Sequence, residues 1–466
     1  MSPTISEIRK MVRGLDQEVP VLGGGRRPYV NLDNAATTPA FRSVADCVAG
    51  ALEWYSSVHR GTGFKSLLST HAYNCSRGAV ARFVGADPAH HAVIFCSNTT
   101  DAINRLCRCF PHKEDDVVLT TIMEHHSNML PWRFCGKVDY ARIKRSDGSL
   151  DTEHLESKLR EYNGKVRLVA VTGASNITGF IPPIREIASV AHRYGAKVLV
   201  DGAQLMAHRP VSMGAPGDSA SIDFLAFSGH KMYAPFGSGA LVGARQCFED
   251  ATPFPVGGGA VELVTLNEVE WADVPEKLEA GTPNLIGVLA LAKAIQTLEE
   301  LGMENVAEHE RALTRKALRA LAVIPGISVY GDTDPALPRD RVGVIPILAE
   351  KINHALLAAI LSYEYGIGVR HGCFCAHPYA GQLLGLSDEE MSAYAAQVRA
   401  VGHGGLPGFV RISFGVYNTA EDVEYLAQAL REIVTRGPRG RYAFDASTGQ
   451  YTPEGFSYDF DSLLGL

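Results

Sequence analysis

The sequence predicts an α/β protein with a large domain on a mainly parallel seven-stranded sheet and a smaller C-terminal α+β domain. From about residue 30 to 290, strand-like apolar runs alternate with helical patterns, which favours a parallel sheet covered on both faces. Runs such as 167–172 and 197–201 are almost continuously apolar, as in strands buried on both faces. The chain has 466 residues, 46% of them hydrophobic, which suits two or three domains.

The expected elements follow in chain order. In the large domain we predict strands at 92–96, 117–120, 137–140, 167–172, 197–201, 223–227 and 239–242, and helices at 74–85, 100–109, 151–161 and 184–194. A helix over 287–301 leads to a second unit, with strands at 327–330, 342–348 and 409–414 and helices at 353–365 and 419–435. The predicted parts are an N-terminal segment 1–29, a large domain 30–290, a small domain 291–435 and an extension 436–466.

Both ends of the chain have weaker patterns. Apolar residues at helical spacing from Ile5 to Leu15 predict a helix, and three glycines at 23–25 indicate a loose linker after it. The tail 436–466 has no clear period, so we expect a loosely docked or partly disordered extension.

Charge and cysteine content exclude several classes of protein. The net charge is −7, from 44 basic and 51 acidic residues, which argues against nucleic-acid binding and a polybasic membrane surface. No run of eighteen apolar residues and no secretory start is evident. Nine scattered cysteines indicate free thiols in a reducing compartment, with the cytoplasm as the expected location.

A lysine follows the apolar run that begins at Asp223. Ser228, His230 and Lys231 lie within four residues at the end of this predicted strand. Desolvation there would lower the pKa of the amine and free its lone pair for a Schiff base. We hypothesise that Lys231 holds pyridoxal phosphate (PLP); the alternative is a solvated loop lysine.

Two other strand ends carry polar residues. Asp201 ends a strand, with Gln204 three residues on, where a carboxylate can pair with a pyridinium nitrogen. Thr99 and Thr100 begin a helix and can hold a phosphate, while Asp101 is expected to point away. The alternatives are a helix-capping aspartate and ordinary N-capping.

Imidazoles and thiols collect at two further places. His125 is adjacent to His126, so one ring can stack on a cofactor while the other points elsewhere; the alternative is two structural histidines. The loop 369–378 holds Arg370 and the nucleophile candidate Cys375. Two other interpretations of this loop are possible. Its thiols can be inert, or a metal site can be made by Cys373, Cys375, His371 and His377.

These segments together resemble the class V aminotransferase group of fold-type I PLP enzymes. The chain is most similar to cysteine desulfurases of the SufS-like (group II) branch, which are relatives of selenocysteine lyase. The motifs that carry the resemblance are 31–38, 58–61, 99–104, 124–128, 175–179, 201–204, 228–231, 257–259, 280–284, 370–375 and 411–419.

The resemblance implies a role for each matching residue toward the cofactor. Lys231 would form the Schiff base, His125 would stack on the ring, Asp201 would pair with the ring nitrogen and Gln204 would contact the phenolate oxygen. Thr100, Ser228 and His230 would hold the phosphate, in addition to Thr99 from the helix start. Thr282 would contact the phosphate of the neighbouring subunit in a homodimer with shared sites.

The resemblance also implies the substrate contacts and the reaction. Substrate-binding residues would be Asn34, Arg60, Asn176, Arg370 and Arg411, of which Asn176 and Arg411 would hold the carboxylate. The catalytic residues would be Lys231, Cys375 and His125. L-Cysteine, or a related sulfur amino acid, would yield L-alanine and a persulfide on Cys375, from which an acceptor protein can take the sulfur.

Two departures from the family pattern keep other readings open. Many group II members have two histidines before the catalytic cysteine, where this chain has Cys373 and Phe374, and His371 stands where threonine is usual. The alternatives are another class V enzyme, a C–S lyase or epimerase in which Cys375 is not essential, and a persulfide- or metal-binding protein.

Overall fold

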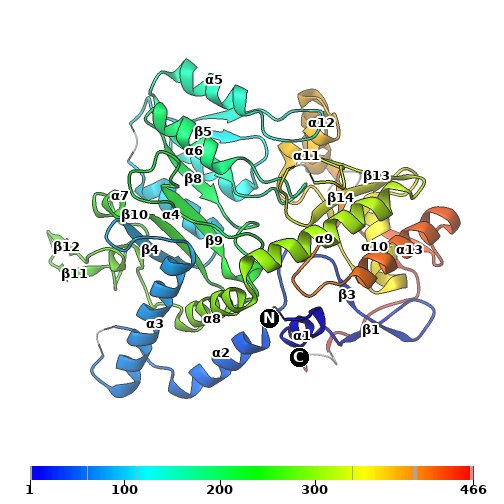
Figure 1. Ribbon diagram of the computed structural model, residues 1–466, viewed down its shortest axis with the longest axis horizontal. Helices are drawn as coiled ribbons and strands as arrows, with labels where there is room; N and C mark the ends of the chain where they lie inside the picture. Colours follow the sequence, from blue (N-terminus) through cyan, green and yellow to red (C-terminus); the bar gives the residue numbers. More distant parts are fainter. Residues whose placement is uncertain are drawn as a thin grey trace.

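The fold has two halves, each built on its own sheet (Figure 1). The computed structural model describes residues 3–59, 61–111, 113–337, 339–401, 407–461 and 465. The larger sheet has the order β4-β10-β9-β8-β7-β5-β6. Only β10 runs antiparallel to its neighbours. Its strands are β4 (His91–Cys96), β5 (Val117–Thr121), β6 (Lys137–Ala141), β7 (Val166–Thr172), β8 (Lys197–Asp201), β9 (Phe224–Ser228) and β10 (Gly239–Ala244).

Two hydrophobic cores cover the two faces of this sheet. Alternate residues of β8 face opposite cores: Val198 and Val200 join one, and Leu199 joins the other. The seven predicted strands and the mainly parallel sheet are therefore confirmed. The covering helices are α2 (Arg42–Trp54), α3 (Phe64–Phe83), α4 (Thr99–Cys109), α5 (Thr152–Tyr162), α6 (Ile184–Arg193), α7 (Arg245–Glu249) and α8 (Leu285–Leu301).

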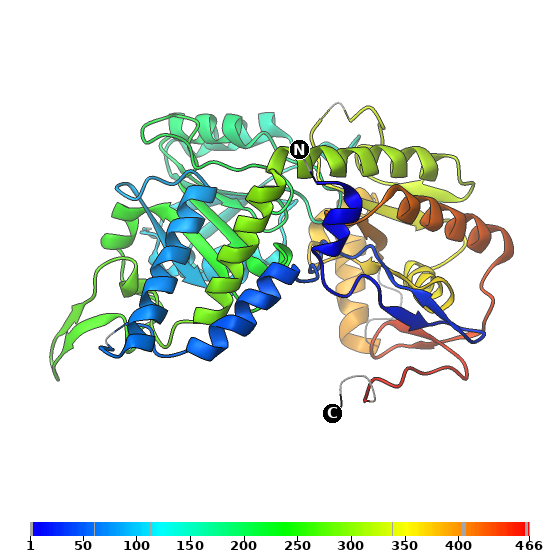
Figure 2. The same ribbon diagram turned by 60° about the horizontal axis from the view of Figure 1, so that its bottom comes forward.

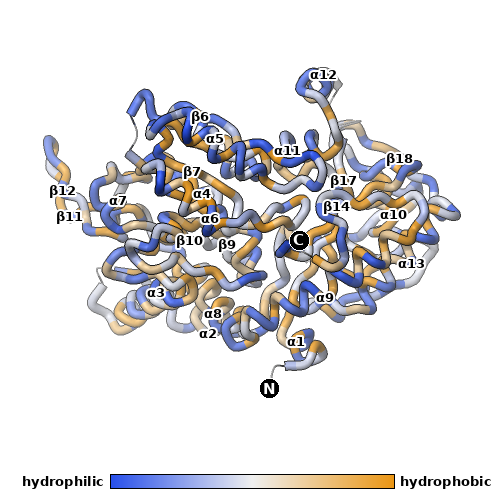
Figure 3. The backbone as a smooth tube through the Cα atoms, turned by 45° about the horizontal axis from the view of Figure 1, so that its top comes forward, coloured by the Kyte–Doolittle hydropathy of each residue, from blue (hydrophilic) through white to orange (hydrophobic). Residues whose placement is uncertain are grey.

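The smaller half is an antiparallel sheet with helices. Its order is β13-β14-β17-β16, from β13 (Ile327–Val329), β14 (Val344–Ala349), β17 (Phe409–Ser413) and β16 (Arg370–Gly372). A separate short pair joins β15 (Ile367–Gly368) to β3 (Val30–Asn31). The helices are α9 (Met303–Ala322), α10 (His354–Tyr365), α11 (His377–Leu383), α12 (Asp388–Val401) and α13 (Ala420–Arg436). In Figure 3 the apolar stretches of backbone gather inside both halves.

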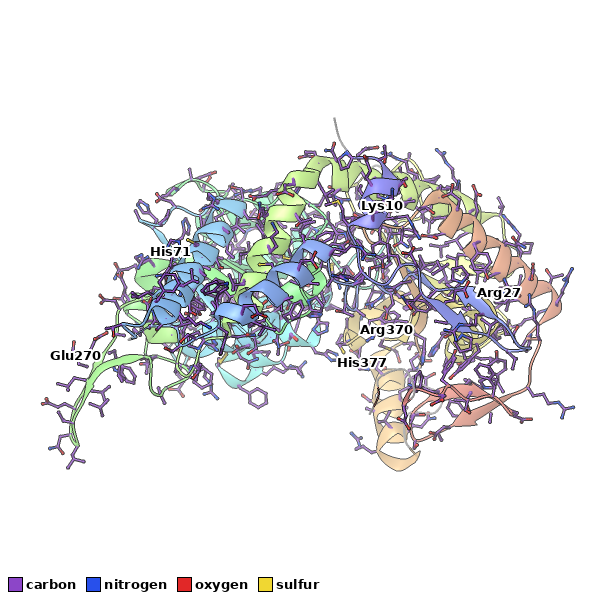
Figure 4. The ribbon with its side chains drawn as sticks, turned by 90° about the horizontal axis from the view of Figure 1, so that it is seen from below. Lys10, Arg27, His71, Glu270, Arg370 and His377 are labelled. Carbon is purple, nitrogen blue, oxygen red and sulfur yellow. A yellow bond between two sulfur atoms is a disulfide. The ribbon has the colours of Figure 1, made fainter. Side chains whose placement is uncertain are left out.

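Several elements were not predicted from the sequence. Helix α3 begins at Phe64, ten residues before the predicted start at 74, because its inner face carries small polar residues such as Ser66 and Ser69 in place of branched aliphatics. Helices α2 and α12 were also missed, as was the hairpin β11 (Val261–Val264) and β12 (Val269–Trp271). This hairpin projects from the large half, with Glu270 near its end (Figure 4).

The predicted loose linker after the N-terminal helix is wrong. Helix α1 (Ile5–Lys10) is followed by a hairpin of β1 (Glu18–Pro20) and β2 (Arg26–Pro28), with glycines 23–25 in its turn. These glycines have φ of 91°, 89° and 94°, which explains the residue type, since side chains with Cβ rarely adopt such values.

The prediction of a loosely docked tail is also wrong for the described residues 437–461. They form a hairpin of β18 (Tyr442–Asp445) and β19 (Gln450–Pro453) that packs on α10, close to the N-terminal hairpin (Figure 2). Buried Glu364 accepts hydrogen bonds from the backbone N–H groups of Arg439 and Gly440 and from the Tyr442 hydroxyl. These contacts are long-range, so local periodicity gave no sign of them.

The prediction that every thiol is free is wrong for one pair. Cys107 on α4 and Cys135 form a disulfide across 28 residues of sequence. The pair forms because α4 packs against the 3-10 helices η1 (His126–Asn128) and η2 (Pro131–Phe134). Among the residues described, no helix has the length and apolar character to cross a membrane.

Candidate active site

A pocket of about 440 Å³ lies at the carboxyl ends of the parallel strands, with one wall supplied by the smaller half. Figure 4 shows Arg370 and His377 at this junction of the two halves. The predicted site residues that line the pocket are Thr99, Thr100, His125, Asn176, Asp201, Gln204, Ser228, His230, Lys231, Arg370, Cys375 and Arg411.

Lys231 lies at the floor of the pocket, in the 3-10 turn η3 (Gly229–Lys231) that follows β9. Burial lowers the pKa of its amine to about 8. The carboxylate of Asp201 opposes this shift and the guanidinium of Arg411 adds to it. About a tenth of the amine is therefore neutral at pH 7, and this is the form that a nucleophile or base requires.

Asp201 ends β8, beside the strand that leads to Lys231. One carboxylate oxygen accepts a 3.0 Å hydrogen bond from the N–H of Ala203, which fixes the side chain. Burial raises the pKa of this carboxyl, and the N–H bond and Lys231 act against the shift. Gln204 lies in the same turn and donates its amide to the carbonyl of Ala35 at 2.7 Å.

Hydroxyl groups gather at the N-terminus of α4. Thr99 contacts the Ser228 hydroxyl both through its N–H, at 2.7 Å, and through its own hydroxyl, at 2.6 Å. The Thr100 hydroxyl lies 2.7 Å from that of Ser127. Asp101 pairs with Arg105, as expected of a carboxylate that avoids an anion site. Hydroxyls at a helix N-terminus form an anion-binding site.

His125 precedes η1 and faces the pocket. Its Nδ1 accepts a 3.1 Å hydrogen bond from the N–H of Ser127, which orients the ring. Burial, with a further contribution from Lys231, lowers the pKa of the imidazole to about 3, so the ring is neutral. Behind it, Glu124 is fully buried and accepts hydrogen bonds from Asn128 and Thr121, which fixes this segment on the sheet.

Two arginines share one carboxylate that the sequence analysis did not single out. Asp33 accepts a hydrogen bond from Arg411 at 3.0 Å and another from Arg370 at 3.1 Å. Arg411 is almost completely buried, and its Nε has no hydrogen-bond partner in the described structure. The sequence signal for Asp33 was its place inside the 31–38 motif. A local motif does not predict that this carboxylate contacts two arginines distant in the sequence.

Cys375 enters the pocket from a turn with unusual backbone geometry. Phe374 and Cys375 have φ of 52° and 55°, in the left-handed region that bulky residues seldom adopt. The Asn176 amide donates to the Phe374 carbonyl at 2.6 Å, and Arg411 lies 4.6 Å from the Phe374 ring centroid. Cys373 turns away, its thiol 3.0 Å from the Pro407 carbonyl, and burial raises its pKa to about 11.

The four candidate metal ligands of this loop do not converge. Cys375 faces the pocket, Cys373 contacts Pro407, His377 pairs with His126, and the His371 ring packs on that of His354. Within the described part of the chain, no group of three or more such side chains is arranged to hold a metal ion.

Residues 30–426 match the family model for the class-V aminotransferases. The chain belongs to this family. A probable cysteine desulfurase from Halalkalibacterium halodurans is 35% identical over 434 residues, which cover 91% of this chain and 97% of the relative. A cysteine desulfurase from Escherichia coli is 33% identical over 443 residues, covering 93% and 99%. The predicted family is confirmed.

Solved structures agree with the fold of this class-V aminotransferase. The apo cysteine desulfurase of Thermococcus onnurineus NA1 superposes with a TM-score of 0.76 at 30% identity, covering 87% of this chain and 95% of that one. A cysteine desulfurase from Escherichia coli gives a TM-score of 0.75 at 27% identity, covering 93% and 99%. The predicted fold-type I architecture is therefore confirmed.

Two predicted site residues of this class-V aminotransferase lie outside the pocket lining, and a third is not described. Asn34 is buried outside the pocket lining, and its amide bonds Ser413, Asn418 and Tyr417. Thr282 is exposed and lines a separate depression of about 790 Å³. Arg60 lies outside the described residues.

Proposed function

We propose that this class-V aminotransferase is a PLP-dependent cysteine desulfurase that converts L-cysteine to L-alanine and carries the sulfur as a persulfide on Cys375. The observation that carries the proposal is that Cys375 and Lys231 line the same pocket. An amine and a thiol in one pocket supply both groups that the reaction needs, one for the proton and one for the sulfur. The names of the relatives support the same activity.

The side chains of the pocket fit PLP. Lys231 is a buried amine of lowered pKa, suited to a Schiff base. Asp201 supplies a carboxylate for the ring nitrogen, and the neutral ring of His125 supplies a flat face. The hydroxyl-rich start of α4, with Ser228 and His230, suits the phosphate. When bound, PLP supplies an electron sink for the charge left at the substrate Cα.

Arg411 and Arg370 suit the carboxylate of an amino acid. Arg411 is buried at the pocket wall, and its Nε lacks a protein partner among the described residues, so a substrate carboxylate can satisfy that donor. Asp33 bonds another nitrogen of Arg411 and orients the guanidinium. Asn176 accepts from Arg411 through its backbone carbonyl, so it positions this arginine as well as the cysteine loop.

Proton and sulfur transfer then belong to two different residues. Lys231, neutral in a fraction of molecules, removes the Cα proton of the bound amino acid and later returns a proton to the product. The thiolate of Cys375 attacks the substrate sulfur, so an S–S bond forms as the substrate C–S bond breaks.

The proposal includes a homodimer in the cytoplasm and a protein that accepts the sulfur. Apolar side chains are exposed on the large half beside the depression that holds Thr282, including Trp54, Phe64, Leu263 and Leu266. Such a surface suits burial against a second copy. Thr282 lies outside its own chain's pocket, which is compatible with a contact to the phosphate of that copy.

One experiment tests the activity. The purified protein is examined for the visible absorbance of lysine-bound PLP, and alanine and sulfide are measured from L-cysteine. We expect Lys231→Ala to lose both the absorbance and alanine formation, and Cys375→Ala to keep the absorbance but lose the persulfide. Cys75→Ala, which removes an exposed thiol on α3, is the matched control.

The outcomes separate the alternatives. A colourless wild-type protein that forms no alanine would contradict the proposal. Full sulfide release by Cys375→Ala would favour a C–S lyase, and conversion of amino-acid stereochemistry without alanine would favour an epimerase.

A further inference from the structure

We infer that His126, supported by His377, is a positioning residue that holds the Cys375 turn in the shape that presents its thiol to the pocket. The inference rests on the proposed function of Cys375. It concerns the second histidine of the 124–128 motif and a histidine two residues after the cysteine, neither of which lines the pocket.

His126 contacts the cysteine turn at two points. Its backbone N–H donates to the carbonyl of Cys375 at 2.7 Å. Its ring Nε2 accepts from the backbone N–H of His377 at 3.3 Å. The peptide groups on both sides of Ala376 are therefore held by one residue that lies next to His125 in the chain.

The two imidazoles reinforce this contact. Nδ1 of His377 lies 3.0 Å from Nε2 of His126, and the rings stack with centroids 4.8 Å apart and planes 16° apart. Because Nε2 of His126 faces the N–H of His377, it must be an acceptor and the His126 ring must be neutral. Burial, followed by the charges of His377 and Arg133, lowers the pKa of His126 to about 4, which agrees with that state.

The turn needs such support because of its backbone. Phe374 and Cys375 both adopt left-handed φ, a conformation that is unfavourable for residues with a Cβ and persists only where neighbours enforce it. Asn176 holds the carbonyl of Phe374, and His126 holds that of Cys375. The His126 ring adds a third contact, to the N–H of His377, so its loss leaves the turn with fewer contacts against relaxation toward commoner backbone angles.

The test compares two substitutions that differ in one acceptor. His126→Leu removes the ring nitrogen, while His126→Gln keeps a side-chain oxygen that can accept from the N–H of His377. The control is His154→Leu, which also removes an imidazole acceptor of a backbone N–H, that of Arg142, far from the pocket. Hydrogen exchange of the peptide 370–379 and the kinetics of alanine formation are measured on the cofactor-loaded enzymes.

We expect His126→Leu to speed exchange in 370–379 about tenfold, as for the loss of one hydrogen bond. Its kcat should fall about tenfold at unchanged KM for cysteine and unchanged PLP absorbance, because binding of substrate and cofactor does not involve the ring. His126→Gln should recover most of both losses, and His154→Leu should match the wild type. His377→Phe, which keeps a stacking ring without Nδ1, should show a smaller change.

Unchanged exchange in His126→Leu, or equal impairment of the Leu and Gln variants, would overturn the inference. A rise in KM or a loss of PLP absorbance would assign His126 to substrate or cofactor binding, and would overturn it as well. If the wild type forms no alanine, the proposed function fails, and the exchange data alone decide whether His126 holds the turn.

Discussion

Asp33 accepts a 3.0 Å hydrogen bond from Arg411 at the wall of the pocket that contains Lys231. The same carboxylate accepts from Arg370, so one acidic residue from the start of the large half holds two arginines of the smaller half. The charge of a buried guanidinium is costly unless a partner compensates it. Asp33 thus keeps Arg411 both charged and oriented, while the Nε of Arg411 has no hydrogen-bond partner among the described residues.

We expect Asp33→Asn to lower the free energy of unfolding by about 2 kcal/mol, because it removes the charge partner of the buried Arg411. Asp46→Asn is the control, since the Asp46–Arg13 pair is exposed on both sides and should be worth well under 1 kcal/mol. Urea unfolding of the two variants measures the difference. Equal, small losses for both would contradict a special role for Asp33.

Lys231 should make the stability of the cofactor-free protein depend on pH. Its pKa falls from 10.5 in the unfolded chain to about 8 in the fold, so between these values the unfolded chain binds more protons. Stability therefore rises as pH rises through this window, and the full cost, about 3 kcal/mol, applies below pH 8.

Lys231→Met should accordingly stabilise the cofactor-free protein by about 3 kcal/mol at neutral pH, with the gain shrinking as pH approaches 10.5. Urea unfolding at several pH values measures this. Lys351→Met, at an exposed position, serves as the control. A gain that is the same at all pH values would show that packing, and not the buried charge, is responsible.

The disulfide between Cys107 and Cys135 closes a stretch of 28 residues. In the chain-entropy model such a link stabilises the fold by about 3.6 kcal/mol. We expect a dithiol reductant to lower the stability of the wild type by this amount and to leave Cys135→Ser unaffected. Cys47→Ser, which removes a free thiol, should respond to the reductant as the wild type does.

The C-terminal hairpin should contribute to the stability of the small half through Glu364. Tyr442→Phe removes one of the three hydrogen bonds to this buried carboxylate and should cost about 2 kcal/mol. Tyr451→Phe, on the facing strand of the same hairpin, should cost much less. Thermal unfolding distinguishes the two. Equal melting temperatures would show that the hairpin is not anchored through Glu364.

Much of the site could be predicted because strand ends carry their own signal. Lys231 and Asp201 each end an apolar run, and Thr99 begins a helix, so each position is marked by a local change of pattern. A motif does not show which of its residues has which role. Asn34 was predicted to bind substrate, but it is a buried structural amide. Its neighbour Asp33, which was not predicted, is the carboxylate that holds two arginines.

The sequence by itself determined the seven strands of the large sheet and the strand-end residues Asp201 and Lys231, because hydrophobic periodicity and strand-end chemistry are local properties. The family, and pocket residues such as Asn176 and Arg411, followed from the resemblance of short motifs to the class V aminotransferases. The tertiary structure alone decided which side chains meet. Asp33 with Arg411, Cys107 with Cys135, His126 with His377 and Glu364 with the tail join segments from 28 to 378 residues apart. Such pairs depend on how the elements pack, and packing is a property of the whole chain that no local pattern contains.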